Sequence, residues 1–128
     1  MQIHTHLGLD RTLVGVPERL GDGRARVSLT ATPAMAADAR GLVHGGFVFG
    51  AADAAAMIAV NDPNVVLGAA SARFVAPVRV GEVVVATATV IAVAGKKRDI
   101  DVSCAVGEKV VFTGTFTAFV LDRHVLDP

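Results

Sequence analysis

The chain has 128 residues, of which 52% are hydrophobic, 19% are charged and 5% are aromatic. This length is typical of one domain with a sizeable core, so we expect residues 1–128 to form a single domain. The formal net charge is zero, which argues against a nucleic-acid partner. The high apolar content also favours burial of surface against a second copy of the chain.

The N-terminus is polar and does not look like a signal peptide. The longest apolar run, near Phe47–Val60, is interrupted by Asp53 and is shorter than the roughly 20 residues that a membrane span needs. The single cysteine, Cys104, excludes an internal disulfide and fits a reducing compartment. We therefore expect a cytoplasmic protein that binds no membrane, with Cys104 in its core.

The first part of the chain predicts two strands after a loose segment, Met1–Asp10. A first strand is predicted at Thr12–Leu20, where Pro17 indicates an edge position. Residues 24–32 alternate in the manner of a half-buried strand, with three apolar side chains on one face: Val27, Leu29 and Ala31. Pro33–Arg40 is then expected to be a connection with one short helical turn.

An Ala-rich stretch predicts a helix over Gly46–Val60, which ends before Pro63. Four strands with short turns follow, at Val65–Val75, Glu82–Ala94, Asp99–Val106 and Lys109–Leu121. In the last strand one face is expected to carry Val110, Phe112, Phe116, Ala118 and Val120. Because the helix is apolar around most of its circumference, we expect an α+β fold in which a curved antiparallel sheet surrounds it.

One carboxylate stands in the middle of this helix. Asp53 lies two turns in, so it is not an N-cap, and the residues from Gly50 to Met57 offer it no charge and no donor. An isolated buried carboxylate is costly or has a raised pKa. Asp53 is therefore either a structural acid, bonded to a distant side chain or exposed at a gap, or a catalytic base or nucleophile in an apolar cleft.

The tripeptide His44-Gly45-Gly46 stands where the helix begins. Free N–H groups at a helix N-terminus favour a developing negative charge, and glycine lets a ligand approach the backbone closely. The amides of Gly45 and Gly46 are thus candidates for binding the oxygen of an acyl group in its tetrahedral state. The alternative is that the two glycines only form a tight turn.

The segment GLVHGGFVFGAADAAAMIAV, Gly41–Val60, resembles the central helix of hotdog-fold acyl-CoA thioesterases, in particular the phenylacetic-acid-degradation group. The shared features are the His-Gly-Gly start and an acid about nine residues after the histidine. The segment SARFVAPVRVGEVVVATATV, Ser71–Val90, resembles the hairpin that follows in this family. The resemblance implies the hotdog fold, a curved antiparallel sheet wrapped around one long helix.

The resemblance also implies a homo-oligomer, a dimer or a dimer of dimers, in which the acid of one subunit faces the helix start of another. Asp53 would then activate water or attack the thioester directly. The Gly46 amide, with Gly45, would polarise the carbonyl, and His44 would orient the loop or contact the thioester. The implied reaction is hydrolysis of an acyl-CoA or similar thioester to free acid and thiol, with no cofactor and no metal.

Other residues have two interpretations. Ser71 is a candidate for the Ser or Thr that some relatives place near the acid, and Phe47, like Phe49, lies either in the core or in an acyl channel. The basic side chains form a solvated surface or meet the phosphates of coenzyme A: Lys96, Lys97 and Arg98 at a predicted hairpin tip, and Arg73 and Arg79. His4 and His6 have a spacing that suits a metal ion. Because they fall in the loose segment, we expect no metal site there.

Two other functions remain open. Asp38 stands six residues before His44, loosely like the acid–histidine pair of enoyl-thioester hydratases on the same fold, although the Asn-Pro expected between them is absent. A non-catalytic acyl-CoA-binding module would use the same pocket without a reactive acid. The sequence does not specify the acyl group.

Overall fold

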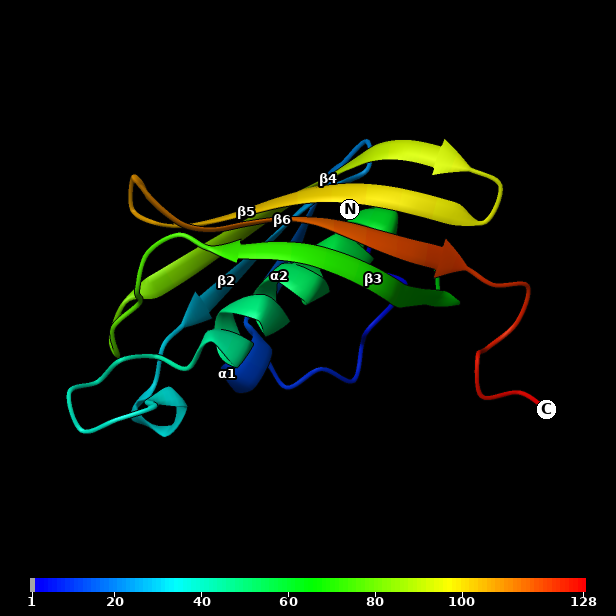
Figure 1. Cartoon of the computed structure of the whole chain (residues 1–128). Coiled ribbons are helices and arrows are strands. Elements are labelled where there is room, and N and C mark those ends of the chain that lie inside the picture. The colour runs from blue at the N-terminus through cyan, green and yellow to red at the C-terminus, as the bar shows by residue number, and fades with distance from the viewer. Residues whose placement is uncertain (1) are drawn as a thin grey trace.

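In the computed structural model, residues 2–128 are described, and six strands form one antiparallel sheet in the order β1-β2-β4-β5-β6-β3. The sheet curves over one side of the long helix α2, and the short helix α1 lies against that helix near its start (Figure 1). The elements are α1 (Arg11–Val14), β1 (Val16–Gly21), β2 (Arg24–Thr30), the 3-10 turn η1 (Pro33–Met35), α2 (Gly45–Val60), β3 (Val65–Phe74), β4 (Val83–Ala94), β5 (Lys97–Val106) and β6 (Lys109–Val120). The expected α+β architecture and its order of elements are confirmed.

Helix α2 supplies the centre of the core. Its side chains are small, and those that are buried line most of its circumference: Val48, Ala51, Ala52, Ala54, Ala55, Ala56, Met57, Ile58 and Ala59. Because alanine occupies little space, β2, β4 and β5 can all pack closely on the helix. The helix ends at Asn61, which adopts a left-handed conformation and donates its N–H to the carbonyl of Met57.

The predicted first strand is wrong over its first residues. Arg11–Val14 forms α1 because the Asp10 side chain accepts hydrogen bonds from the N–H groups of Thr12 and Leu13, at 2.8 and 3.3 Å. Gly15 ends this helix at a φ of 114°, and β1 begins only at Val16. Pro17 does lie on an edge strand, as predicted.

The predicted face of the last strand is wrong at its beginning. Val110 is 41% exposed, whereas Val111 is only 1% exposed. The pairing between β5 and β6 shifts register between Cys104 and Ala105, so the strict alternation does not extend back to Val110. From Phe112 onward the expected buried face is confirmed, as is the burial of Cys104.

The N-terminal segment is attached more firmly than predicted, although Met1 lies outside the described residues. Asn61, at the end of α2, accepts the N–H of His4 at 2.7 Å and donates its side-chain amide to the Gln2 carbonyl at 3.0 Å. Thr5 is buried. None of the helices in the described part of the chain is long and apolar enough to cross a membrane.

Strand β3 forms the far edge of the sheet and pairs only with β6. Its residues from Gly68 to Phe74 are exposed and mostly small. A long edge without a second partner strand, here with Arg73 as its one charged residue, is a ready surface for pairing with another strand. Gly114 of β6 lies close to this strand, since a Cβ placed there would be 2.9 Å from the Ser71 carbonyl oxygen.

Candidate active site

Asp53 lies half-buried on α2, between residues that are almost all apolar. Its Oδ1 atom is buried and has no hydrogen-bond partner among residues 2–128. Removal of the carboxylate from water raises its pKa above the ordinary value of 3.8. The chain therefore holds an unsatisfied carboxylate, which is a strong hydrogen-bond acceptor and a stronger base than an exposed aspartate.

The start of α2 presents two amides without side-chain caps. His44 is the N-cap residue, and its side chain makes no capping bond to the helix. Its own N–H donates to the Met35 carbonyl at 2.9 Å, which fixes the chain as it enters the helix. Gly45 and Gly46 follow as the first two helical residues, where N–H groups have no acceptor within the helix. These amides can bind an oxygen that carries negative charge.

The two glycines differ in their surroundings. A Cβ at Gly45 would lie 3.1 Å from the Phe74 ring, so this position is packed against the end of β3. A Cβ at Gly46 would meet only the His44 ring, at 3.2 Å, and Gly46 is exposed. The imidazole of His44 is also exposed and lies edge-on to Phe47, with 6.2 Å between the ring centroids. The Gly46 amide is therefore the more accessible of the two.

Asp53 and these amides do not form one site within a single chain. Asp53 stands eight residues after Gly45, which is about 12 Å along an α-helix. A base and an oxyanion donor acting on one carbonyl group must both lie within about 3 Å of the reacting atoms. Asp53 and the helix-start amides of one chain therefore cannot act together on the same carbonyl group.

An apolar groove of about 330 Å³ opens beside the start of α2. It is lined by Val43, Gly45, Val48, Phe74, Val75, Ala76, Pro77, Val78 and Val111, none of which has a polar side chain. We did not predict this groove from the sequence. The available signal was the apolar run Phe74–Val78, which continues past the end of β3 into a connection where polar residues are usual.

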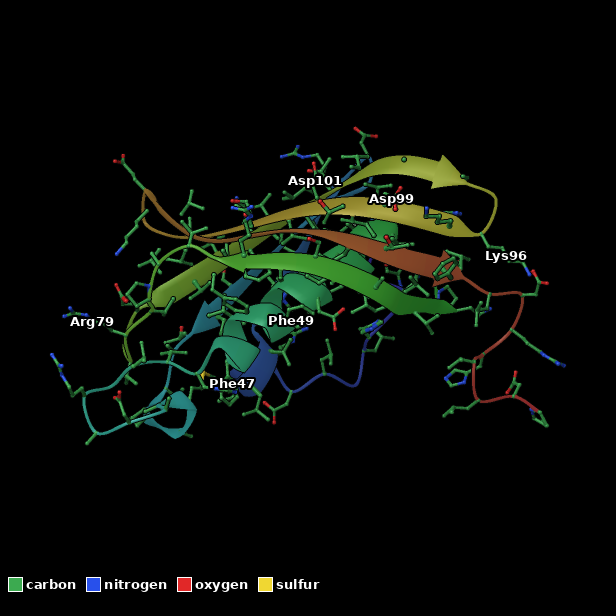
Figure 2. All side chains as sticks on the ribbon, in the orientation of Figure 1. Phe47, Phe49, Arg79, Lys96, Asp99 and Asp101 are labelled. Atoms are coloured by element: carbon green, nitrogen blue, oxygen red, sulfur yellow. The ribbon has the colours of Figure 1, made fainter. Side chains whose placement is uncertain are left out.

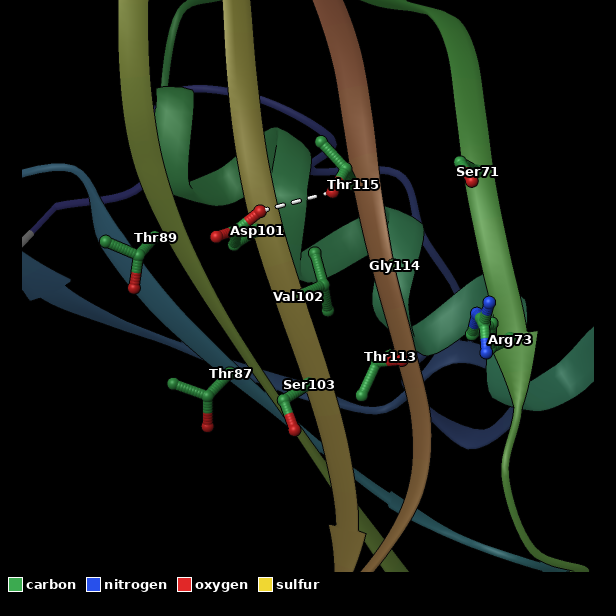
Figure 3. A pocket seen from close by; sticks show the side chains of 10 residues that line it. All are labelled: Ser71, Arg73, Thr87, Thr89, Asp101, Val102, Ser103, Thr113, Gly114 and Thr115. Carbon is green, nitrogen blue, oxygen red and sulfur yellow. Dashed lines mark hydrogen bonds between the residues drawn. The ribbon is translucent and has the colours of Figure 1, made fainter.

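The structure separates the remaining candidates from this site. Ser71 and Arg73 lie on the face of the sheet turned away from α2, around a polar hollow of about 560 Å³ (Figure 3). In that hollow Thr115 donates to Asp101 at 3.2 Å. Phe49 packs against the core rings of Phe112 and Phe116 and is a core residue, with centroids 6.4 and 5.4 Å away.

The basic hairpin between β4 and β5 lies at the opposite end of the molecule from the start of α2, as the labelled Lys96 and Phe47 show (Figure 2). Lys96 forms an ion pair with Asp122 at 2.9 Å, and Arg98 donates to the Gly95 carbonyl at 2.7 Å. Lys97 is exposed. Within residues 2–128, no cluster of three or more His, Cys, Asp or Glu side chains has the geometry of a metal site.

Comparison with known proteins agrees with this fold. The family model described as the Thioesterase superfamily matches residues 40–103, half of the chain, which includes the start of α2 and Asp53. The chain therefore belongs to the thioesterase superfamily, whose members have the hotdog fold seen here. Its structure is similar to that of an uncharacterized protein, PH1136, from Pyrococcus horikoshii, with a TM-score of 0.97, 48% identity, and coverage of 99% of this chain and 98% of that one.

Two curated relatives carry other names. The chain is 48% identical to methylthioribose-1-phosphate isomerase of Aquifex aeolicus over 123 residues, which cover 95% of this chain and 27% of that protein. It is 38% identical to transcription factor FapR of Shouchella clausii over 79 residues, which cover 62% of this chain and 41% of that protein. The chain thus spans less than half the length of these curated relatives.

Proposed function

We propose that this chain hydrolyses acyl-CoA or related acyl thioesters to a free acid and a thiol, at a site shared between two copies. The observation that carries the proposal is the buried, unpartnered Oδ1 of Asp53 in an apolar helix. A folded protein that only needed to be stable would gain from an apolar residue there, because the carboxylate is desolvated without compensation. A reactive role accounts for its presence.

In the proposed reaction, the Asp53 carboxylate takes a proton from a water molecule, whose oxygen attacks the thioester carbonyl carbon. The carbonyl π electrons move to the oxygen, and the resulting oxyanion accepts hydrogen bonds from the amides of Gly46 and Gly45. Collapse of this intermediate reforms the C=O bond and breaks the C–S bond, and the leaving thiolate takes the proton from Asp53. The alternative is direct attack by Asp53, which gives an anhydride that water then cleaves. Neither route needs a metal or a cofactor.

A homodimer supplies the missing geometry. The exposed edge of β3 and the exposed side of α2, which carries Gly46, Gly50 and Asp53, are candidates for contact with a second copy. A Cβ at Gly50 would meet no atom within 4 Å in one chain, so another helix has room to approach there. A two-fold axis near this surface would bring Asp53 of each copy toward the helix start of the other and would form two equal sites.

The apolar groove beside Gly45 is the proposed seat of the acyl group. It contains no side chain that could pair with a charge. A carboxylate or hydroxyl on the acyl group would lose its hydration there without replacement. Apolar acyl groups are therefore the proposed substrates, with His44 and Phe47 at the mouth of the site.

A second candidate function is a non-catalytic acyl-CoA sensor, which the similarity to a transcription factor favours. It requires no reactive carboxylate, so Asp53 argues for the enzyme. The hydratase alternative has less support, because the Oδ1 of Asp38 accepts the N–H groups of Arg40 and Leu42, at 2.9 and 3.2 Å, and serves the loop.

A panel of acyl-CoA substrates with a thiol-detecting dye separates the three functions. A thioesterase releases thiol, a hydratase changes the absorbance of an enoyl-CoA without releasing thiol, and a sensor does neither but shows a shifted melting temperature with CoA esters. Asp53→Asn should lower turnover by at least about two orders of magnitude. Asp22→Asn, in the exposed turn between β1 and β2, removes the same charge and should leave turnover unchanged. Full activity in Asp53→Asn would refute the proposed role.

A further inference from the structure

A second groove, of about 280 Å³, adjoins the apolar groove at the start of α2. It is lined by Asp38, Arg40, Leu42, Pro77 and Arg79. Pro77 also lines the apolar groove, so the two grooves meet at this residue. Together they form a surface that is apolar at one end and carries two guanidinium groups at the other.

Two segments far apart in the sequence build this second groove. Leu42 and Arg79 form an antiparallel bridge, and Val80 donates its N–H to the Gly41 carbonyl at 2.9 Å. The same pairing continues toward the helix, where Val43 donates to the Val78 carbonyl at 2.8 Å. The groove is thus fixed to the backbone that leads into α2.

The groove is also close to the proposed oxyanion site. Leu42 stands three residues before Gly45, so their Cα atoms are at most about 10 Å apart. Arg79, paired with Leu42, extends outward at the end of the molecule where α2 begins (Figure 2). A molecule whose carbonyl lies at the helix start can therefore reach these arginines through a linear arm.

Both guanidinium groups are available for a ligand. Neither Arg40 nor Arg79 takes part in an ion pair or a side-chain hydrogen bond within residues 2–128. The neighbouring acids are engaged with backbone N–H groups instead: Asp38 accepts from Arg40 and Leu42, and Glu82 accepts from Arg79 at 2.7 Å. The acids shape the loops while the guanidinium groups stay exposed to solvent.

We propose that Arg40 and Arg79 bind the phosphate of a phosphorylated pantetheine arm, the carrier part of the thioester substrate. Guanidinium groups form paired, charge-assisted hydrogen bonds to phosphate oxygens. The acyl group then lies in the apolar groove, the thioester at the helix start, and the phosphate in the second groove. This assignment rests on the proposed function for the position of the thioester, but the affinity for the carrier can be measured without turnover.

The basic hairpin is the competing candidate for the same phosphate. The hairpin lies at the end of the molecule opposite the start of α2, and Lys96 is already paired with Asp122. Within one chain it is too remote to serve a thioester held by the amides of that chain. Lys97→Gln is therefore tested as a separate variant.

Binding of CoA without an acyl group, measured by calorimetry, tests the assignment. The variants are Arg40→Gln, Arg79→Gln and both together, with Arg24→Gln on β2 as the matched control for loss of an exposed arginine. Loss of charge-assisted bonds to phosphate should raise the Kd of the double variant about tenfold or more, and it should reduce the dependence of Kd on salt. Arg24→Gln and Lys97→Gln should bind CoA as the unmodified protein does. The same titrations with phosphopantetheine test whether the phosphate on the pantetheine arm alone accounts for the loss of affinity. Phosphopantetheine also represents the arm that a carrier protein would present.

Hydrolysis supplies a second readout. With an acyl-CoA, the double variant should show a raised KM and a nearly unchanged kcat. With an acyl N-acetylcysteamine thioester, which carries no phosphate, its rates should equal those of the unmodified protein. If no thioester is hydrolysed but the affinity for CoA still depends on the two arginines, the enzymatic proposal fails and this assignment stands. Any of three results would overturn the assignment of Arg40 and Arg79. These are an unchanged Kd for CoA in the double variant, a loss of affinity in Lys97→Gln instead, and no binding of CoA by the unmodified protein.

Discussion

Gly45 packs against the ring of Phe74, so that a Cβ at Gly45 would lie 3.1 Å from the ring. This contact joins the start of α2 to the end of the edge strand β3. The helix amides are thereby held beside the one long strand edge that remains open at this side of the sheet. A second copy that pairs with this edge would bring its own α2, and its own Asp53, near those amides.

The charge of Asp53 should reduce the stability of the folded chain at neutral pH. Folding raises the pKa of this carboxyl group, so the native state binds its proton more tightly than the unfolded state does. The free-energy cost of the ionised carboxylate is full above the pKa of Asp53 in the folded state. It falls as the pH drops through that pKa, and it is absent below the pKa in the unfolded state. Asp53→Asn should therefore have a higher melting temperature at pH 7, and the difference should disappear in acid. Equal melting temperatures at pH 7 would contradict a desolvated carboxylate.

The pH dependence of the reaction should report the same group. Only the ionised form of Asp53 is a base or a nucleophile, so kcat/KM should fall with decreasing pH. The apparent pKa of this fall should lie above the 3.8 of an ordinary aspartate, because burial raises the pKa of the Asp53 carboxyl group. Initial rates with a neutral acyl-CoA from pH 4 to pH 8, corrected for any unfolding in acid, provide the measurement. A rate that stays flat across this range would contradict a base or nucleophile with a raised pKa.

Two substitutions at Gly46 should separate the effect of losing the amide N–H from the effect of added side-chain bulk. Alanine keeps the N–H and adds a Cβ that meets only the exposed His44 ring. Proline adds a similar bulk but removes the N–H. The first turn of a helix tolerates proline. The preceding residue, Gly45, has no Cβ that would clash with the proline ring. Gly46→Pro should have a kcat lower than that of Gly46→Ala by about 10²–10³, the usual effect of losing one oxyanion donor. Circular dichroism of both variants checks that α2 still forms, and equal kcat values would show that this amide takes no part.

Cys104 should be inert in the folded state. The side chain is fully buried on β5, and burial raises the pKa of its thiol to about 12, so almost no thiolate exists at neutral pH. A thiol-detecting dye should therefore react with Cys104 only after unfolding, and the dye assay should report the released thiol alone. Rapid labelling of one thiol per chain under native conditions would contradict this burial.

Much of the fold was predictable because its signals are local. The Ala-rich run before Pro63 defines α2, and the alternation of Val27, Leu29 and Ala31 defines the buried face of β2. Helix α1 was missed because it spans only four residues and depends on a cap by Asp10. The exposed Val110 was missed because a shift in pairing with β5 places Val111 inside instead. Such a shift depends on how two strands meet, which periodicity in one strand does not report.

The candidate site is also predictable from the sequence only in part. Asp53 and the two glycines stand out in the sequence because a lone acid and an uncapped glycine pair are unusual in and before an apolar helix. Arg79 is a candidate from the sequence alone, but its pairing with Arg40 in one groove is not, because that groove forms only when residues 36–43 meet residues 78–80. Ser71 was a reasonable candidate by sequence position, but the register with Thr115 directs it to the face of the sheet away from α2.

Complementation between two inactive variants tests the shared site most directly. Asp53→Asn and Gly46→Pro are each expected to have little activity alone. In a mixed dimer, Asp53 of the Gly46→Pro copy faces the intact amides of the Asp53→Asn copy, so one of the two sites is restored. Subunit exchange of an equal mixture should recover about a quarter of the unmodified activity, since half of the dimers are mixed and each has one working site. A mixture no more active than the separate variants, with exchange verified by mass spectrometry, would contradict a site shared between two copies.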